Sequence, residues 1–152
     1  MAHINYYMDF TVDVFIVCQN KVLLRMHEKY KQWFAVGGHI DPGEDPNQAA
    51  VREVKEEVGL NVILHGSIPP LSNEKYKELI PPPFMNRHHI SETHEHMSLV
   101  FFATSDTEEL HIDEGAEKAE CKWFAKKELG DSKYGINPQI QHYARTALEK
   151  AR

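Results

Sequence analysis

Three glutamates in one short segment, Glu53, Glu56 and Glu57, are the residues of this chain best suited to carry chemistry. In a helix, at about 100° per residue, their side chains fall on one arc of the surface. Like charges at these spacings repel, so an isolated helix gains no stability from them. A divalent cation reverses that balance, because Mg²⁺ prefers oxygen ligands and commonly bridges protein carboxylates to substrate phosphates. The pattern predicts a metal site for phosphate chemistry, with a solvated acidic helix face as the alternative.

The element that must position these side chains is a helix with clear signals at both ends. Asp45 is a good N-cap, Pro46 suits the first helical position, and Gln48 completes a capping-box-like pair with Asp45. Gly59 suits the left-handed residue that follows a helix. The expected helix therefore runs from about Pro46 to Val58.

A second arc of the same helix is apolar and predicts how the helix packs. Val51, Val54 and Val58 fall beside the acidic arc, so we expect this side to lie against a β-sheet while the glutamates point into a cleft. Arg52 precedes Glu56 by one helical turn, and its guanidinium can hold a carboxylate through two parallel hydrogen bonds.

The residues around this helix have a recognisable spacing. Gly38 is followed after five residues by Glu44, and after seven more by the run REVKEEVGL, which begins at Arg52 and ends at Leu60. This segment resembles the signature of the Nudix hydrolases, with every fixed position occupied. The resemblance implies that family's fold, an α/β protein with a Nudix α/β/α sandwich and a mixed central sheet, as a single domain over residues 1–152.

The resemblance also implies a metal and a reaction. Glu56 and Glu57 would be the main ligands of Mg²⁺ or Mn²⁺, joined by Glu53 and by a backbone carbonyl of the turn at Gly37 or Gly38, while Arg52 and Glu44 would orient them. The expected reaction is hydrolysis of a phosphoanhydride bond in a nucleoside diphosphate linked to a group X. Such substrates include nucleoside triphosphates, dinucleoside polyphosphates and nucleotide sugars.

Further catalytic acids are expected outside the helix. In many Nudix proteins a Glu-rich loop before a Trp-Phe strand supplies an acid for metal binding or water activation. Here Glu117 and Glu120 stand before Trp123, and we favour Glu117. Glu53 or Glu117 would take the proton from water. The alternative for either loop residue is an ordinary surface carboxylate.

Two isolated residues are candidates for substrate binding. His39 follows the glycine turn and is expected either to contact phosphate or to face water. Tyr76 lies in the proline-rich stretch Pro69–His89, which cannot join a sheet interior and predicts a long loop. Family members that cleave diadenosine polyphosphates carry a base-stacking tyrosine in this region, so the resemblance implies that role for Tyr76.

A histidine-rich stretch precedes a strongly predicted strand, Met97–Ala103. With period two, His94 and His96 share one face with Ser98, Val100 and Phe102, and that face is expected to line a polar pocket. We expect His94 and His96 to donate hydrogen bonds to substrate. The alternatives are an additional transition-metal site or a solvated strand edge.

The remaining strands and helices are predicted from runs rich in β-branched residues, from turn residues and from apolar residues at helical spacing. The expected strands are Tyr6–Cys18, Lys21–Met26, Trp33–Val36, Asn61–Ile68 and Cys121–Phe124, with a shorter one around Leu110–Ile112. Ala125–Leu129 predicts a helical turn. Asn137 and Pro138 suit the start of a final amphipathic helix.

The amino-acid composition limits the kinds of binding partner that are expected. The 152 residues carry a formal net charge of -6, which argues against general nucleic-acid binding. Cys18 and Cys121 form no paired motif, and no stretch is predicted to be a signal peptide or membrane span, so we expect a cytoplasmic protein. The resemblance to the Nudix family implies a small-molecule nucleotide substrate. Homodimerisation is common in the Nudix family and is a further expectation. The alternative functions are a non-catalytic nucleotide-sensing module and a hydrolase of non-nucleotide pyrophosphates.

Overall fold

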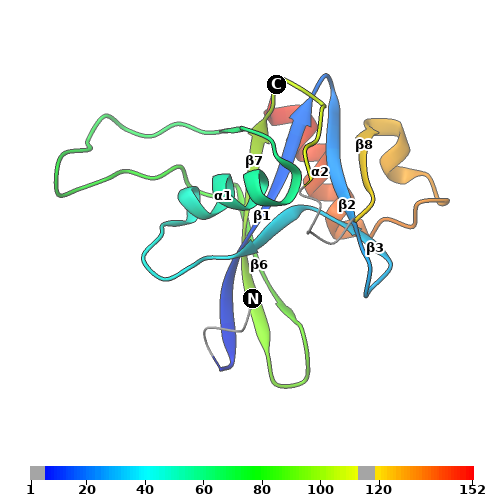
Figure 1. Ribbon diagram of the computed structural model, residues 1–152, viewed down its shortest axis with the longest axis horizontal. Coiled ribbons are helices and arrows are strands. Elements are labelled where there is room, and N and C mark those ends of the chain that lie inside the picture. The colour runs from blue at the N-terminus through cyan, green and yellow to red at the C-terminus, as the bar shows by residue number, and fades with distance from the viewer. Residues whose placement is uncertain (1–5, 113–118) are drawn as a thin grey trace.

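The computed structural model describes residues 6–112 and 119–152, and these build one mixed β-sheet with helices on both sides (Figure 1). The strands are β1 (Met8–Cys18), β2 (Lys21–His27), β3 (Gln32–Phe34), β4 (Val36–His39), β5 (Ile63–Leu64), β6 (Phe84–His89), β7 (Glu95–Thr104) and β8 (Cys121–Ala125). The helices are α1 (Pro46–Val58), the 3-10 helix η1 (Lys126–Gly130) and α2 (Pro138–Lys150).

The sheet is organised around the parallel pair β1 and β7. Their register runs from Met8 opposite Glu95 to Val17 opposite Thr104. The neighbouring strands β2 and β4 pair antiparallel with β1, while β5 and β6 pair antiparallel with β7. The β1–β2 turn uses Gln19 and Asn20 with φ of 48° and 62°, which suits the right-handed twist of a tight hairpin. The strands predicted at Tyr6–Cys18 and Lys21–Met26 therefore form a hairpin.

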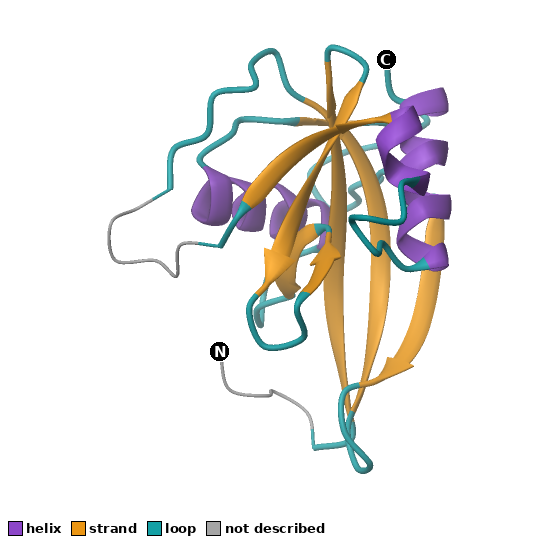
Figure 2. Ribbon diagram, turned by 90° about the vertical axis from the view of Figure 1, so that its right-hand side faces the viewer, coloured by secondary structure: helices purple, strands orange, loops and turns teal. Residues whose placement is uncertain are grey.

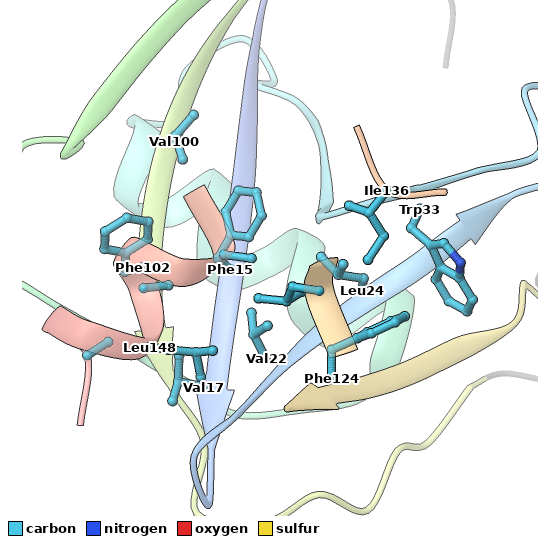
Figure 3. Close-up of a cluster of buried hydrophobic side chains, with 14 residues drawn as sticks. Phe15, Val17, Val22, Leu24, Trp33, Val100, Phe102, Phe124, Ile136 and Leu148 are labelled. Atoms are coloured by element: carbon cyan, nitrogen blue, oxygen red, sulfur yellow. The ribbon is translucent and has the colours of Figure 1, made fainter. Parts of the chain in front are cut away.

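Each face of the sheet carries its own hydrophobic core. On the α1 side, buried residues such as Val14 and Phe101 pack against Val54 and Val58 of the helix. On the α2 side, Figure 3 shows a second cluster of buried side chains. Its labelled members are Phe15, Val17, Val22, Leu24, Trp33, Val100, Phe102, Phe124, Ile136 and Leu148. Figure 2 shows the two helices on opposite sides of the strands, so the expected α/β/α sandwich is confirmed.

Helix α1 begins and ends as its sequence predicts. The Asp45 side chain accepts a hydrogen bond from the Gln48 amide, the Gln48 side chain accepts one from the Asp45 amide, and Gly59 adopts the left-handed conformation with φ 72°. The predicted apolar arc is right for Val54 and Val58 but wrong for Val51, which is 40% exposed. Ala49 and Ala50 are buried instead, which turns the packed side of the helix away from Val51.

Several strand predictions need correction. The predicted strand Asn61–Ile68 is reduced to β5, and the stretch around Leu110–Ile112 forms no strand. The expectation of a loop throughout Pro69–His89 is wrong for its last 6 residues, which form β6 along the edge of β7. The prediction of one strand at Trp33–Val36 is also wrong, because the chain leaves β3 after Phe34 and enters β4 at Val36.

The faces of β7 also differ from expectation. Leu99 and Phe101 pack on the α1 side. The opposite face is polar only at its start, because Val100 and Phe102 are fully buried under α2. The polar pocket expected along this whole face is therefore confined to the half of the strand that precedes Val100.

Helix α2 covers the far side of the sheet. The predicted final strand, helical turn and C-terminal helix appear as β8, η1 and α2. Asn137 occupies the N-cap position, but its side chain donates to Gln32 Oε1 at 2.7 Å instead of capping the helix. Within residues 6–112 and 119–152, no helix combines the length and apolar character needed to cross a bilayer.

Candidate active site

Arg52 lies at the centre of a network that joins three glutamates to the loop before α1. Its Nε and Nη2 donate to the two oxygens of Glu44 at 3.0 and 2.6 Å. Its Nη1 donates to Glu53 at 2.9 Å and to Glu56 at 3.1 Å. Nη2 also donates to the backbone carbonyl of His39 at 3.0 Å. The guanidinium thus fixes the glutamates against the end of β4.

Glu57 is held separately, on the backbone of the glycine turn. Its Oε2 accepts from the Gly37 amide at 3.3 Å, and its Oε1 lies 3.8 Å from Arg25 Nη1. Burial raises the pKa of Glu57 to about 7, with Arg25 opposing the shift. Arg25 on β2 therefore faces a carboxylate.

Glu53 is the most enclosed of the three helix carboxylates. The residue is only 8% exposed, and its carboxylate rests directly against Gly38. A Cβ on Gly38 would overlap that carboxylate, so the glycine is needed for this approach. Burial is the largest cause of a raised pKa at Glu53, while hydrogen bonding to Arg52 lowers it.

This donor set fits a hard divalent cation. Glu53 is buried and Glu57 is half-buried, desolvation disfavours the charged forms of both carboxylates, and a cation favours them. Glu56 is exposed at the same edge of α1. Glu53 and Glu56 share Arg52 as a partner, while Glu57 is held by the Gly37 amide. They supply the oxygen ligands that Mg²⁺ and Mn²⁺ prefer.

One further buried acid beside the site was not proposed from the sequence. Asp13 on β1 lies opposite Gly37 in the β1–β4 register, and burial raises its pKa to about 6, while a hydrogen bond with Ser98 lowers it. Thr11 and Ser98 are joined by a hydroxyl–hydroxyl hydrogen bond of 2.7 Å on the same face. The signal that the sequence offered for Asp13 was a single acid within the otherwise apolar residues 12–18.

His94, just before β7, and His39, at the end of β4, meet another acid near the start of β1. His94 Nε2 and His39 Nε2 each lie 3.2 Å from Asp9 Oδ2. The ring centroid of His96 lies 5.3 Å from that of His94 and 5.0 Å from that of His39. The structure therefore brings together three of the four residues predicted to bind substrate, His39, His94 and His96.

Tyr76, the fourth, lies apart from the others, in the long loop between β5 and β6. It is 56% exposed, and Figure 1 shows the loop extending outward beside α1. The loop is tied to the helix by Asn47, whose side chain donates to the Ile80 carbonyl at 2.9 Å and accepts from the Ile80 amide at 2.8 Å.

Of the two candidate acids in the Glu-rich loop, the structure describes Glu120. Glu117 lies outside the residues that the structure describes, so its predicted role stays a prediction. Glu120 is exposed, and its backbone carbonyl accepts a hydrogen bond from the Met26 amide at 2.7 Å.

A hollow of about 350 Å³ opens beside the Arg52 network. Its lining includes Phe10, Ile40 and Leu99 on apolar sides and Asp41 on a polar one. Asp41 Oδ2 lies 3.5 Å from Arg52 Nη2, so the hollow adjoins the acidic cluster directly. An apolar concavity with a few polar groups at one end is typical of small-molecule sites.

The chain is similar to known proteins in both sequence and fold. A family model described as the NUDIX domain matches residues 9–146. In the crystal structure of a hydrolase of the NUDIX family from Clostridium perfringens, 38% of residues are identical, with a TM-score of 0.83, covering 93% of this chain and 96% of that one.

Two further proteins are similar, one over about half of the chain and the other at low sequence identity. The "Putative 8-oxo-dGTP diphosphatase" of Bacillus subtilis (strain 168) is 33% identical over 72 residues, which are 45% of this chain and 48% of that protein. The chain therefore matches about half the length of that relative. An Ap4A hydrolase from C. elegans, solved as a binary complex, has 19% identity and a TM-score of 0.58, covering 93% of each chain, and shares the fold.

Proposed function

The chain belongs to the family of NUDIX hydrolases, and we propose that this member is a divalent-metal-dependent pyrophosphohydrolase of nucleoside diphosphates linked to a group X. Water attacks phosphorus, a phosphoanhydride bond breaks, and two phosphate-bearing products leave. Support for a pyrophosphohydrolase comes from the family match and from the Bacillus subtilis relative, whose name specifies a diphosphatase.

The observation that carries this proposal is the Arg52 network beside the glycine turn. One guanidinium donates to Glu44, Glu53 and Glu56, and the turn binds Glu57 through the Gly37 amide. A structural helix would gain nothing from three glutamates gathered this way, because like charges repel at these spacings. A catalytic helix needs them, because phosphate substrates are anionic and require cations to approach carboxylates.

Roles are proposed from the contacts of the described residues and, for Glu117, from the family resemblance. Glu53, Glu56 and Glu57 would hold Mg²⁺ or Mn²⁺ together with a Gly37 or Gly38 carbonyl, and Arg52 and Glu44 would keep them in place. The metal would neutralise phosphate charge and make water more acidic. As the water oxygen bonds to phosphorus and the anhydride P–O bond breaks, the proton passes to Glu53 or Glu117.

The hollow beside Asp41 is proposed to receive the nucleoside part of the substrate. Its apolar lining by Phe10, Ile40 and Leu99 suits the flat surface of a base, and its volume of about 350 Å³ lies in the range of small-molecule sites. Its polar end adjoins Arg52 through Asp41, which would place the phosphates toward the glutamates.

The test is a substrate panel assayed with Mg²⁺ and with Mn²⁺. Nucleoside triphosphates, including oxidised purine forms, dinucleoside polyphosphates and nucleotide sugars are incubated with the protein, and the products are separated by ion exchange. The expected result is cleavage of at least one class in a strictly metal-dependent manner. Binding of nucleotides without turnover would support a sensing module instead, and turnover of inorganic or non-nucleotide pyrophosphates alone would contradict the nucleotide assignment.

A further inference from the structure

A buried carboxylate at the start of β1 is surrounded by imidazole rings. Asp9 is 1% exposed, and both His39 Nε2 and His94 Nε2 lie 3.2 Å from its Oδ2. An ionised carboxylate removed from water is costly unless it is paired with charge or coordinates a metal. The rings around Asp9 therefore meet a strong requirement for positive charge.

Strand register explains why these residues meet. Asp9 and His96 are direct partners in the parallel β1–β7 ladder, so their side chains leave the sheet on the same face. One ligand atom from each of Asp9, His94 and His96 can be chosen so that all lie within 4.8 Å of one another. Among residues 6–112 and 119–152, this is the one group of at least three metal-binding side chains that meets that spacing.

His94 is held rigidly, with its ring nitrogens in defined roles. Its carbonyl oxygen accepts hydrogen bonds from the amides of Ile90 and Ser91, at 2.9 and 3.1 Å. Its Nδ1 lies 3.1 Å from the Tyr6 carbonyl oxygen, which can only accept, so we assign the proton of the neutral ring to Nδ1. In that tautomer Nε2, 3.2 Å from Asp9 Oδ2, is the nitrogen that can bind a metal ion.

The Asp9 carboxylate attracts a cation beside His94 Nε2, which can be the proton of an imidazolium or a metal ion. A metal-binding histidine usually donates its other ring N–H to a backbone carbonyl or a carboxylate, as His94 Nδ1 can to the Tyr6 carbonyl. The separation also suits such an ion: a tetrahedral metal with bonds of about 2.0–2.1 Å holds its ligand atoms roughly 3.3–3.4 Å apart.

We propose that Asp9, His94 and His96 form a transition-metal site, selective for Zn²⁺, that is separate from the acidic site of α1. Two imidazoles and one carboxylate are a common zinc ligand set, whereas Mg²⁺ prefers oxygen ligands alone. His39 Nε2 lies 3.2 Å from the same Asp9 oxygen and positions it. Three protein ligands leave a fourth position open to water or to a phosphate oxygen of a substrate.

The site lies at a distance from the acidic cluster but is connected to it. Asp9 is four residues from Asp13 along β1, which corresponds to roughly 13 Å in an extended strand. His39 joins the two regions, because its ring contacts Asp9 while its carbonyl oxygen accepts from Arg52 at 3.0 Å. The proposed zinc site is therefore a second centre, linked to the acidic site through His39.

The experiment measures metal binding directly, so its outcome is independent of catalysis. The full-length protein is freed of metal with a chelator and titrated with Co²⁺, a coloured substitute for Zn²⁺, in excess Mg²⁺. The expected result is one tightly bound equivalent with visible absorption bands of four-coordinate Co²⁺, displaced by Zn²⁺. X-ray absorption of the Zn²⁺-loaded wild-type protein should show nitrogen and oxygen neighbours at about 2.0–2.1 Å and imidazole scattering.

Variants then locate the ion. His96→Ala and Asp9→Asn should each weaken binding by about 100-fold or more, since even loss of an outer-sphere partner costs 10- to 100-fold. His89→Ala, in the same histidine-rich stretch but with an exposed side chain, is the matched control and should bind as the wild type does. The double variant Glu56→Gln/Glu57→Gln should also retain the tight equivalent.

Three results would overturn the proposal. One is the absence of a tight equivalent in the wild-type protein, which would leave the cluster as a hydrogen-bonded pair of imidazolium and carboxylate groups. The second is binding that survives His96→Ala but is lost in Glu56→Gln/Glu57→Gln. The third is a Zn²⁺ spectrum without imidazole scattering, and because it uses the wild-type protein it stands even where a variant fails to fold.

Discussion

The guanidinium of Arg52 and the carboxylate of Glu44 form a two-point pair, with Nε and Nη2 of the arginine donating to separate oxygens at 3.0 and 2.6 Å. The hydrogen bonds from Arg52 are the main cause of a lowered pKa at Glu44, so this carboxylate stays ionised. The pair leaves Nη1 directed at Glu53 and Glu56. Glu44 thus orients the cation that in turn orients the glutamates of α1.

Arg52→Lys tests whether this geometry, rather than positive charge alone, supports activity. Lysine keeps the charge but cannot make the two-point contact with Glu44 and also reach Glu53 and Glu56. We expect kcat/KM to fall on the order of 100-fold, the size of effect that misplacement of catalytic groups by about 1 Å can have. Arg87→Lys, at an exposed pair with Glu95, is the control and should change kcat/KM little. Equal losses in both variants would contradict the role of Arg52.

Gly38→Ala tests the close approach of Glu53 to the turn. A methyl group at this position would overlap the Glu53 carboxylate, so the helix or the turn must shift. We expect a loss of about 1–3 kcal/mol in unfolding free energy, measured by urea denaturation, together with loss of turnover. Gly130→Ala is the matched control, because its new methyl group would meet Nη2 of Arg145, the end of a flexible side chain.

The raised pKa of Asp13 predicts that the unfolding free energy depends on pH. Its pKa in the folded protein is raised to about 6 from 3.8, so the folded state binds this proton more tightly than the unfolded state. The stabilisation that this bound proton gives the folded state is fully present below the pKa of Asp13 in the unfolded chain. It is lost as pH rises through about 6. Between pH 4.5 and 7.5, Asp13 should lower the unfolding free energy by about 2 kcal/mol.

Asp13→Asn removes this titration while keeping the size of the side chain. Urea denaturation at both pH values, without added divalent metal, compares the variant with the wild type. The stability difference between them should move in favour of Asp13→Asn by about 2 kcal/mol from pH 4.5 to pH 7.5. A difference independent of pH would show that the pKa of Asp13 is not raised.

Asn47 is predicted to control the order of the loop that carries Tyr76. Asn47→Ala removes both hydrogen bonds to the Ile80 backbone, which should cost about 1–2 kcal/mol locally and speed proteolysis and amide exchange within residues 65–83. Lys77→Ala removes only an exposed ion pair with Asp45 at 3.6 Å and should leave both rates nearly unchanged. Unchanged exchange at Ile80 in Asn47→Ala would contradict the clamp.

Local signals were sufficient to predict α1 from the sequence. Asp45, Gln48 and Gly59 act within a few residues of the helix ends, so their effect can be inferred without the rest of the fold. The resemblance then supplied the expected roles of the glutamates and Arg52. The structure adds how they are held, through partners such as the Gly37 amide that sequence spacing does not specify.

Long-range pairing accounts for what sequence did not predict. Phe84–His89 follows three prolines and contains little β-branched character, so only the available edge of β7 makes it a strand. Asp9 lies far from His94 in the sequence, and only the parallel β1–β7 register brings their side chains to the same face. Val51 is exposed because Ala49 and Ala50 let α1 approach the sheet with a different side.

The central claim is that the carboxylates of α1 bind the metal of a phosphoanhydride hydrolase, and Glu57→Gln tests it most directly. The substitution keeps the size of the side chain and a hydrogen-bond acceptor for the Gly37 amide but removes the charge. The measurement is kcat at saturating Mg²⁺ on the best substrate of the panel, beside Glu149→Gln, an exposed glutamate of α2. We expect Glu57→Gln to lose at least about 100-fold in kcat with unchanged circular dichroism. Wild-type turnover in Glu57→Gln would contradict the account.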